Sequence, residues 1–541
     1  MSDGRFNVPT PVNEPIKGYA PGSPERAGLE GRIDAMAKER VEAPCVIGGR
    51  DVTTGDTFVA RAPHRHDLEL ADVHAAGRDE VQQAIDAALA AKHDWSRMPF
   101  EHRCSVFLRA ADLLAGSWRD TVNAATILNQ SKSVQQAEID AACELIDFLR
   151  FNVAFAQQVY EQQPASVPGE WNRTDHRPLE GFVLAVTPFN FTAIAGNLPT
   201  APALMGNTVV WKPSEKQALS AHHLMRLFQA AGLPDGVINL VHGDGAQAVD
   251  VATNSPHLGG LHFTGSATVL SGLFRKVGER IDTFRSFPRI VGESGGKDFV
   301  VAHPSASTDP LVVALGRGAF EYQGQKCSAA SRAYLPRSVW EQVRDPLADL
   351  ASSLTMGDVS DDLSTFMGAV IDGNAWRKHR DAIEEARSQG VEVLVGGECD
   401  DTDGWFVPPT VLVTDDPRSR TMTEELFGPI LTVHVYDDGS WDDMLTEVDE
   451  AAPYALTGAV FAEDLGAIAQ ATDALRDTAG NFYVNDKPTG SIVGRQPFGG
   501  ARRSGTNDKA GSVLNLQRWV SPRVIKETWA APIDYRYPHQ G

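Results

Sequence analysis

The sequence has 541 residues, of which 42% are hydrophobic and 22% charged, a composition typical of globular proteins with more than one domain. The net charge of −22 is spread along the chain, which argues against nucleic acid as a partner. Five cysteines at irregular spacing, without a CxxC pair, argue against a disulfide framework and a zinc site. No apolar stretch approaches the roughly 20 residues that span a bilayer, and the opening residues lack a signal peptide's apolar core. We therefore expect no membrane partner and a cytoplasmic location, or the mitochondrial matrix if a presequence has been removed.

The first 75 residues are rich in Pro and Gly, and we expect them to form an irregular extension laid over the body. From Arg78 onward, apolar residues at helical spacing predict three amphipathic helices, around 81–89, 107–114 and 139–148. Short apolar runs separated by helix-length segments follow, and this alternation is typical of βαβ units around a parallel sheet. The strands are expected at 181–186, 208–211, 236–241 and 260–263, then at 298–302, 331–335, 391–397 and 430–436, with a helix across 311–322. We expect two α/β domains with a ligand cleft between them.

Cys327 lies in the segment GQKCS (324–328), which is too polar for a core strand. A free cysteine is usually a small buried hydrophobe, but the neighbouring Lys326 would favour the reactive thiolate, so we interpret Cys327 as a nucleophile. Glu293 lies upstream in GESGGK (292–297), which by itself would indicate an ordinary turn.

Six segments in this order resemble the aldehyde dehydrogenase superfamily, over nearly the whole chain from about Val81 onward. They are PFNF (188–191), WKPSE (211–215), FTGS (263–266), GESGGK (292–297), GQKCS (324–328) and EELFGP (424–429). The resemblance implies that Cys327 adds to an aldehyde carbonyl. The amide of Asn190 and the backbone N–H of Cys327 would stabilise the oxyanion. Glu293 would act as the general base that hydrolyses the thioester, which favours a carboxylate product over transfer to coenzyme A.

The same resemblance implies NAD as the cofactor. Lys212 and Glu215 would bind the adenosine ribose, where a carboxylate would repel the 2′-phosphate of NADP; otherwise they are a solvated lysine and a capping acid. Gly265 and Ser266 would receive the pyrophosphate at a helix N-terminus. The implied cofactor residues are Thr187, Lys212, Glu215, Gly265, Ser266, Glu425 and Phe427.

Two patterns are set aside. GDGAQA (243–248) fits a dinucleotide fingerprint, but Asp244 would face an anionic pyrophosphate, so we interpret it as a strand-to-helix turn. The histidines at 222–223 and 64–66 lack a further ligand cluster, so we expect them on the surface and predict no metal site.

Other segments resemble the Δ1-pyrroline-5-carboxylate dehydrogenase branch: PFNFTAI (188–194), Ser294, NDKPTGS (485–491), QPFGG (496–500) and SGTNDK (504–509). The branch implies oxidation of glutamate γ-semialdehyde to glutamate in proline degradation. Ser328 and the 490–491 loop would bind the substrate carboxylate, Glu144 the ammonium, and two phenylalanines would line the methylene chain; a plain turn, a solvent-facing glutamate and core packing are the alternatives. The implied substrate residues are Ser328, Gly490, Ser491, Phe498, Phe191 and Glu144.

The resemblance implies the α/β aldehyde dehydrogenase fold. A Rossmann-like NAD domain would span 76–160 and 181–293, a catalytic α/β domain 294–510, and a β oligomerisation arm 161–180 and 511–541. Within the arm, segments near 165–178 and 514–527 would pair as strands. Such an arm implies a homodimer or an assembly of dimers, and the branch leaves a proline dehydrogenase partner open. Two alternatives remain from the sequence: a dehydrogenase for another semialdehyde, or a thiol hydrolase that uses Cys327 without NAD.

Overall fold

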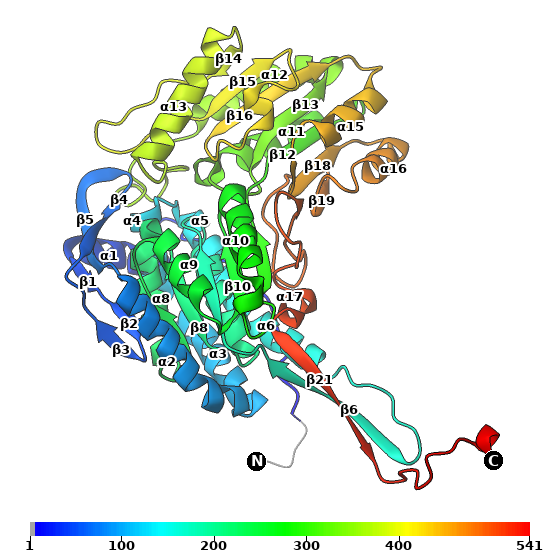
Figure 1. The fold of residues 1–541 in the computed structure, drawn as a ribbon. Coiled ribbons are helices and arrows are strands. Elements are labelled where there is room, and N and C mark those ends of the chain that lie inside the picture. The colour runs from blue at the N-terminus through cyan, green and yellow to red at the C-terminus, as the bar shows by residue number, and fades with distance from the viewer. Residues whose placement is uncertain (1–5) are drawn as a thin grey trace.

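The computed structural model describes residues 6–541, so the first five residues of the expected extension lie outside the described part. Two seven-stranded sheets with helices packed on them form the body, and a long two-stranded hairpin projects from it (Figure 1). Within this range no helix is long and apolar enough to cross a membrane. The two sheets with their covering helices confirm the expected α/β fold.

The first sheet has the order β11-β10-β7-β8-β9-β2-β3, and its five strands from β7 to β11 run parallel. β7 lies between β8 and β10, so the strand order reverses beside it, and ligands bind at the carboxyl ends of strands at such a point. Its parallel strands match the predicted runs: β7 (Phe182–Thr187), β8 (Val209–Pro213), β9 (Ile238–Leu240), β10 (Leu258–Thr264) and β11 (Arg289–Glu293).

The second sheet has the order β14-β15-β16-β13-β12-β18-β19 and is parallel except for the edge strand β14. The four strands predicted after Lys297 are β12, β13, β14 and β16, and all four are confirmed. The strands are β12 (Asp298–Ala302), β13 (Ala330–Pro336), β14 (Glu392–Val395), β15 (Thr410–Thr414), β16 (Ile430–Tyr436), β18 (Thr457–Phe461) and β19 (Asn481–Val484). A small separate sheet pairs β17 (Tyr454–Ala455) with β20 (Ala501–Arg502).

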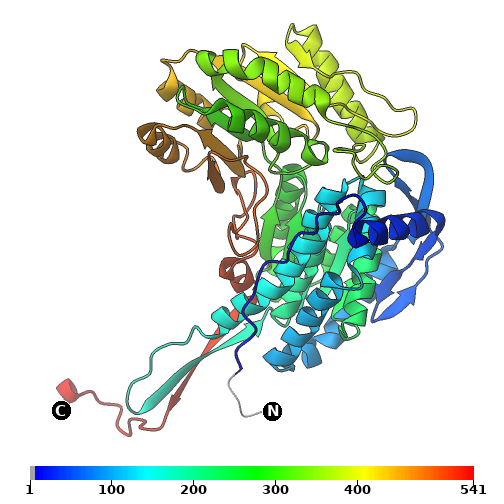
Figure 2. The same ribbon diagram turned by 180° about the vertical axis from the view of Figure 1, so that it is seen from behind.

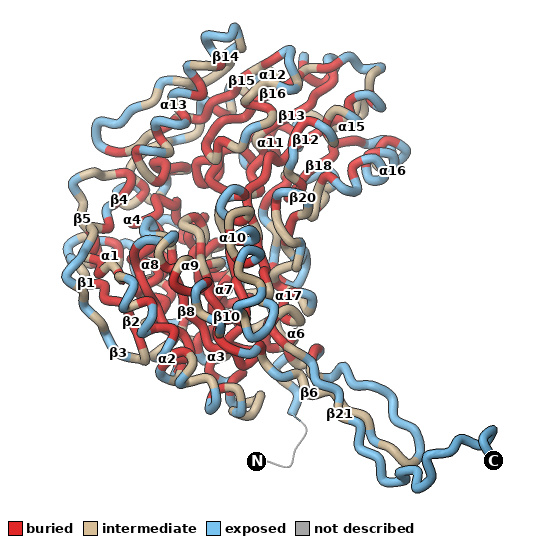
Figure 3. The backbone as a smooth tube through the Cα atoms, in the orientation of Figure 1, coloured by how far each residue is buried: buried red, intermediate tan, exposed pale blue. Residues whose placement is uncertain are grey.

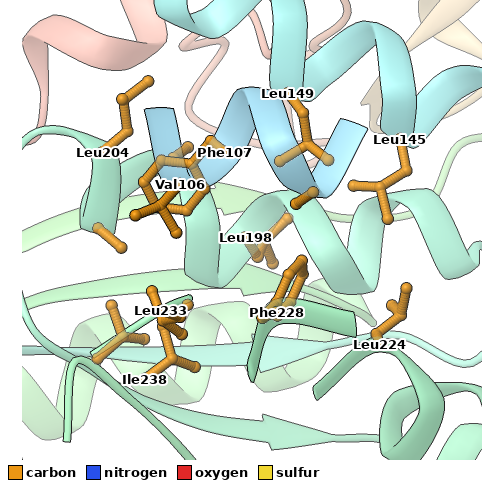
Figure 4. Packing of buried hydrophobic residues seen from close by; sticks show 14 of the residues in the cluster. Val106, Phe107, Leu145, Leu149, Leu198, Leu204, Leu224, Phe228, Leu233 and Ile238 are labelled. Carbon is orange, nitrogen blue, oxygen red and sulfur yellow. The ribbon is translucent and has the colours of Figure 1, made fainter. Parts of the chain in front are cut away.

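Helices on the first sheet enclose the largest hydrophobic core, in which Phe107, Leu145, Leu198 and Phe228 come from four different helices (Figure 4). The three helices predicted there are present, and a fourth, α4, was not predicted; every residue from 122 to 130 is buried, polar side chains included. The helices of this half are α2 (Arg78–Arg97), α3 (Phe100–Ala115), α4 (Arg119–Gln130), α5 (Val134–Ala137), the π-helix η1 (Glu138–Cys143), α6 (Glu144–Tyr160), α7 (Thr192–Leu204), α8 (Ala218–Ala230), α9 (Gly245–Asn254) and α10 (Ala267–Glu279).

The second sheet is covered by its own helices, and α11 confirms the helix predicted across 311–322. These helices are α11 (Thr308–Phe320), α12 (Arg337–Ser353), α13 (Gly373–Ser388), α14 (Arg420–Thr423), α15 (Trp441–Glu450) and α16 (Leu465–Ala474). Single 3-10 turns are η2 (Glu215–Gln217), η3 (Ile281–Thr283), η4 (Glu321–Gly324) and η5 (Pro538–Gln540).

The expectation of an irregular extension is wrong for most of residues 6–75. After a segment without helix or strand comes α1, and two of the strands that follow add an edge to the first sheet. The first three of these strands are only three residues long, too short for an alternating pattern to mark them. The elements are α1 (Pro24–Lys38), β1 (Val41–Ala43), β2 (Cys45–Ile47), β3 (Arg50–Val52), β4 (Thr57–Ala62) and β5 (Arg65–His74).

The projecting hairpin pairs β6 (Glu170–Pro178) with β21 (Val520–Thr528) antiparallel along their full length. Its residues are intermediate or exposed except for the buried Val520, and the chain beyond it is exposed (Figure 3). The strand was expected to begin near Leu514, but α17 (Val513–Gln517) occupies that position and buries Leu516 in the core. The pairing of the two predicted arm segments is confirmed.

Candidate functional site

Cys327 lies on the turn between α11 and β13. The chain reaches it through a tight bend in which Tyr322, Gln323 and Gly324 all have positive φ, and a Cβ on Gly324 would lie 2.3 Å from the carbonyl oxygen of Gly428. Only glycine fits that position. The bend leaves Cys327 half-buried between two small cavities, one shared with Ser328 and one shared with Glu425.

The surroundings of Cys327 disfavour its thiolate form. Burial raises its pKa above the ordinary value, and the negative charges of Asp298, Glu425 and Glu293 raise it further. The expectation that Lys326 favours the thiolate is wrong, because its ammonium is directed elsewhere, 3.6 Å from Asp140 and 3.6 Å from Glu321. Loss of the thiol proton therefore needs an acceptor during the reaction.

Asn190 is buried beside the cysteine turn. Its side-chain NH2 donates one hydrogen bond of 3.0 Å to the backbone carbonyl of Gln325, two residues before Cys327. An amide NH2 has two hydrogens, so a second donor remains for a ligand oxygen. Gln325 is itself held by Ile371, whose N–H donates to its side-chain oxygen at 2.9 Å.

Glu293 ends β11 and is held against the segment 499–500. One carboxyl oxygen accepts a 3.0 Å hydrogen bond from the Gly500 N–H, and the other is buried with no partner. Burial raises the pKa of Glu293 well above its usual range, and the charge of Asp508 adds to the effect. The carboxyl lines neither cavity, so it must rotate away from Gly500 to reach a ligand on Cys327.

The Gly295-Gly296 pair lets Glu425 approach the turn after β11. A Cβ on Gly295 would lie 1.8 Å from a carboxyl oxygen of Glu425, and the Gly296 N–H donates to that oxygen at 3.0 Å. Burial raises the pKa of Glu425 to about 7. Lys378 was not predicted from the sequence. Its ammonium donates to the backbone carbonyl of Glu425 at 2.7 Å, and this contact places it at the site.

The other predicted cofactor residues follow neighbouring strands of the first sheet. Thr187 ends β7, Lys212 lies on β8, and Glu215 opens the exposed turn after it. Gly265 and Ser266 follow β10, where the Ser266 hydroxyl caps α10 by accepting from the Val269 N–H at 3.3 Å. Parallel strands present these residues at one edge of the sheet, as a dinucleotide site requires.

Two features of this edge fit a dinucleotide. Lys212 is buried, with its ammonium so close to α9 that a Cβ on Gly245 would lie 3.3 Å from it, and burial lowers its pKa. The rings of Phe189 and Phe427, one from each half of the molecule, meet edge-to-face at 5.8 Å. A buried cation suits ribose hydroxyls, and the aromatic pair forms an apolar wall.

The patterns set aside earlier have structural explanations. Asp244 caps α9, accepting from the Ala246 N–H at 2.7 Å, so the GDGAQA segment forms the expected strand-to-helix turn. Among residues 6–541 no group of three or more His, Cys, Asp or Glu could hold a metal ion. His64 and His222 are buried rather than on the surface, which corrects that part of the interpretation.

All six predicted substrate residues line the cavity on the other side of Cys327. Ser328 is buried, and its hydroxyl lies 2.8 Å from that of Thr489, a residue to which no role was assigned. Burial and the charge of Asp140 raise the pKa of Glu144 to about 8. The lining consists of Asp140, Glu144, Phe191, Ile194, Lys326, Cys327, Ser328, Thr489, Gly490, Ser491 and Phe498.

A buried charge network supports this cavity. Lys132 donates to Asp140 at 2.7 Å, and its ammonium lies 4.2 Å from the ring centres of both Phe191 and Tyr322. Such contacts stabilise a desolvated cation. The network connects the cavity wall at Phe191 to the bend before Cys327, and the sequence offered no signal for it.

A Rossmann-like sheet lies beside a second α/β half (Figure 1), and Cys327 lines a cavity formed by residues of both halves, an arrangement that fits an NAD-dependent dehydrogenase. The aldehyde dehydrogenase family model matches residues 52–525, and the chain belongs to the aldehyde dehydrogenase family. A mitochondrial delta-1-pyrroline-5-carboxylate dehydrogenase from Dictyostelium discoideum is 47% identical, covering 99% of this chain and 96% of that protein.

Two solved structures extend the comparison. The delta-pyrroline-5-carboxylate dehydrogenase from Mycobacterium tuberculosis bound with NAD is 57% identical, covers 100% of both chains and has a TM-score of 0.96. Proline utilization A from Bdellovibrio bacteriovorus is 29% identical with a TM-score of 0.90, covering 99% of this chain and 55% of that one.

Proposed function

We propose that this chain oxidises L-glutamate γ-semialdehyde, the open form of Δ1-pyrroline-5-carboxylate, to L-glutamate in proline degradation. The observation that carries the proposal is the match over 100% of both chains to the NAD-bound Mycobacterium tuberculosis structure. The cavity beside Cys327 supports it, because hydroxyl and backbone groups at Ser328 and Gly490 suit the carboxylate of an amino acid. Water supplies the oxygen that the product gains.

The nucleophile is the thiol of Cys327, which adds to the aldehyde carbon while its proton passes to a base. The second N–H of Asn190 and the backbone N–H of Cys327 stabilise the oxyanion that forms. NAD, when bound on the Glu425 side, accepts the hydride that this adduct expels. Glu293, after turning from Gly500, activates the water that hydrolyses the thioester.

For NAD we assign Thr187, Lys212 and Glu215 to the adenosine side, and Gly265 with Ser266 to the pyrophosphate. Glu425 and Phe427 hold the nicotinamide ribose. These assignments correspond to an NAD domain over 76–160 and 181–293 and a catalytic domain over 294–510. For the substrate, Ser328, Gly490 and Ser491 take the carboxylate, Glu144 the ammonium, and Phe191 with Phe498 the methylene chain.

The experiment is to follow NADH absorbance when purified protein meets Δ1-pyrroline-5-carboxylate. Succinate semialdehyde and 2-aminoadipate semialdehyde serve as competing substrates on the same preparation. A larger kcat/KM for either would replace the assigned substrate, and aldehyde consumption without NADH would favour the thiol hydrolase.

We also propose that the hairpin, with 161–180 and 511–541, joins two copies of the chain. An isolated two-stranded hairpin is marginally stable in water, and this one exposes Trp171 and Val524. Sedimentation at micromolar concentration should give a dimer or larger assembly, and a monomer would refute the arm. We further propose that a proline dehydrogenase supplies the substrate, and co-purification of the two proteins would test this. The location is either the cytoplasm or the mitochondrial matrix, and cell fractionation would distinguish the two.

A further inference from the structure

The segment 7–19, here called the N-terminal strap, runs across the body without helix or strand (Figure 2). Its backbone is tied to α6 and η1 by side chains. The Val8 N–H donates to Gln157 at 2.8 Å, the Glu14 N–H to Asp147 at 2.7 Å, and the Lys17 N–H to Glu138 at 2.8 Å. The strap therefore lies along η1 and α6, and Glu144 is the first residue of α6.

A buried ion cluster fixes the strap. Arg119 is 1% exposed and donates to Glu138, which is fully buried, and to Glu14 at 2.6 Å. The Tyr19 hydroxyl donates to Glu138 at 2.9 Å, and the Pro15 carbonyl accepts from Arg119 at 2.9 Å. Charges buried in this way tolerate little displacement, because each would lose its partner.

Asn13 connects the strap to the substrate loop, defined as residues 489–496. Its side-chain NH2 donates to Asp147 at 2.8 Å and to the Val493 carbonyl at 2.8 Å, while its oxygen accepts from Arg495 at 3.1 Å. Both amide hydrogens and the amide oxygen are thus in use. Val493 lies two residues after Ser491 on the same loop.

The substrate loop also packs directly against α6. A Cβ on Gly494 would lie 2.2 Å from the ring of Phe151, so the loop touches the helix there and cannot move closer. A cavity beside it is lined by the strap residues 13–16, by Glu144 and by Gly490 with Ser491, and it shares these last three with the substrate cavity. The hydrogen bond from Asn13 to Val493 therefore holds the loop close to Gly490 and Ser491, which line both cavities.

We propose that Asn13 is a positioning residue for the amino-acid end of the substrate. By holding the Val493 carbonyl, it fixes the loop where Gly490 and Ser491 reach the substrate carboxylate. The proposal rests on the proposed function, since it concerns recognition of that carboxylate. It gives the N-terminal strap a part in specificity, although the strap itself touches neither Cys327 nor the cofactor edge.

The first test is Asn13→Ala. Losing the hydrogen bonds to Val493 and Arg495 of the loop should raise the KM for glutamate γ-semialdehyde by at least roughly 2- to 13-fold, the effect of the neutral bond alone, with a smaller change in kcat. The KM values for propanal and NAD should not change, because neither uses the loop. Val12→Ala is the matched control, since Val12 is 69% exposed on the same segment. Equal losses for both aldehydes, or no loss for either, would overturn the proposal.

A second pair of variants separates positioning from stability. In Asn13→Asp two carboxylates face each other, so the melting temperature should fall. Adding Asp147→Asn restores a donor and acceptor between strap and helix, but a carboxylate at position 13 still cannot donate to the Val493 carbonyl. The double variant should regain its melting temperature while the semialdehyde KM stays raised. A carboxylate at position 13 can still accept from Arg495, so recovery of both would show that the hydrogen bond to the Val493 carbonyl is not needed. Absence of semialdehyde oxidation in the wild-type protein would instead refute the proposed function.

Discussion

The hydroxyl oxygens of Ser328 and Thr489 lie 2.8 Å apart, and both side chains are buried in the wall of the substrate cavity. Ser328 follows the nucleophile, and Thr489 begins the substrate loop, so this bond joins the two elements. It uses only one of the two hydroxyl hydrogens. The other remains available to a substrate carboxylate, which has acceptor oxygens only.

Ser328→Ala should therefore impair the semialdehyde specifically. Loss of a hydrogen bond to a charged group predicts a fall of roughly 10- to 150-fold in kcat/KM. Propanal has no carboxylate, so its oxidation should change little when measured on the same preparation. Thr489→Val is the companion variant, which leaves Ser328 free to donate and should cost less. Equal losses on both aldehydes would mean that Ser328 supports Cys327 instead.

Cys327→Ala should abolish NADH production while NAD binding, measured by calorimetry, stays nearly unchanged. The thiol is the proposed nucleophile, and the residues assigned to NAD lie on other segments. Cys399→Ala serves as the control, because Cys399 is also partly exposed but lies in another part of the second half. Turnover in Cys327→Ala above the contaminating background would refute covalent catalysis by this residue.

Glu293→Gln should separate the two half-reactions. Acylation survives, so the first turnover should give a burst of NADH near one per active site, followed by a slow steady state. Glutamine is close in shape and can keep the contact with the Gly500 N–H, so the fold should persist. Rapid-mixing absorbance measures both phases, and a steady state equal to that of wild type would assign the base elsewhere.

Glu138→Gln should destabilise the protein. Removing the charge weakens one of the two carboxylate partners of the buried Arg119; breaking a buried pair costs about 3–5 kcal/mol of unfolding free energy, and the pair with Glu14 sets this as the upper limit. Glu30→Gln removes the surface pair with Arg26 and should cost about 1 kcal/mol or less. Urea unfolding of both variants measures the difference, and equal costs would contradict the role of burial.

Sequence reasoning succeeded where the chain carries local or familiar signals. Buried strands such as 298–302 are short apolar runs between helix-length segments, and those patterns need no knowledge of neighbours. The predicted substrate residues came from motifs and share one cavity in the structure. By contrast, α4 was not predicted, and the burial of its polar residues Asn123 and Gln130 follows from the helices packed around it rather than from its own sequence.

Other features depend on contacts between distant segments. The direction of Lys326 is set by Asp140 on η1, and sequence adjacency to Cys327 misled the interpretation. Asn13 and Val493 are separated by 480 positions, and nothing near Asn13 indicates that its amide would meet the substrate loop. Lys132 is likewise explained by Asp140 and by the rings of Phe191 and Tyr322, all from other segments. Tertiary contacts of this kind leave no periodicity to detect.

The carboxyl of Glu144 should make semialdehyde binding depend on pH. Its pKa of about 8 means that it holds a proton below that pH in the free enzyme. An ammonium group binds the ionised form, so the semialdehyde KM should fall as pH rises toward 8 and then level off. Dividing by the propanal KM at each pH removes titration of Cys327 and Glu293, which act on both aldehydes. Glu144→Gln should raise the KM and abolish this dependence, and a ratio independent of pH in the wild type would exclude Glu144 as the partner of the ammonium.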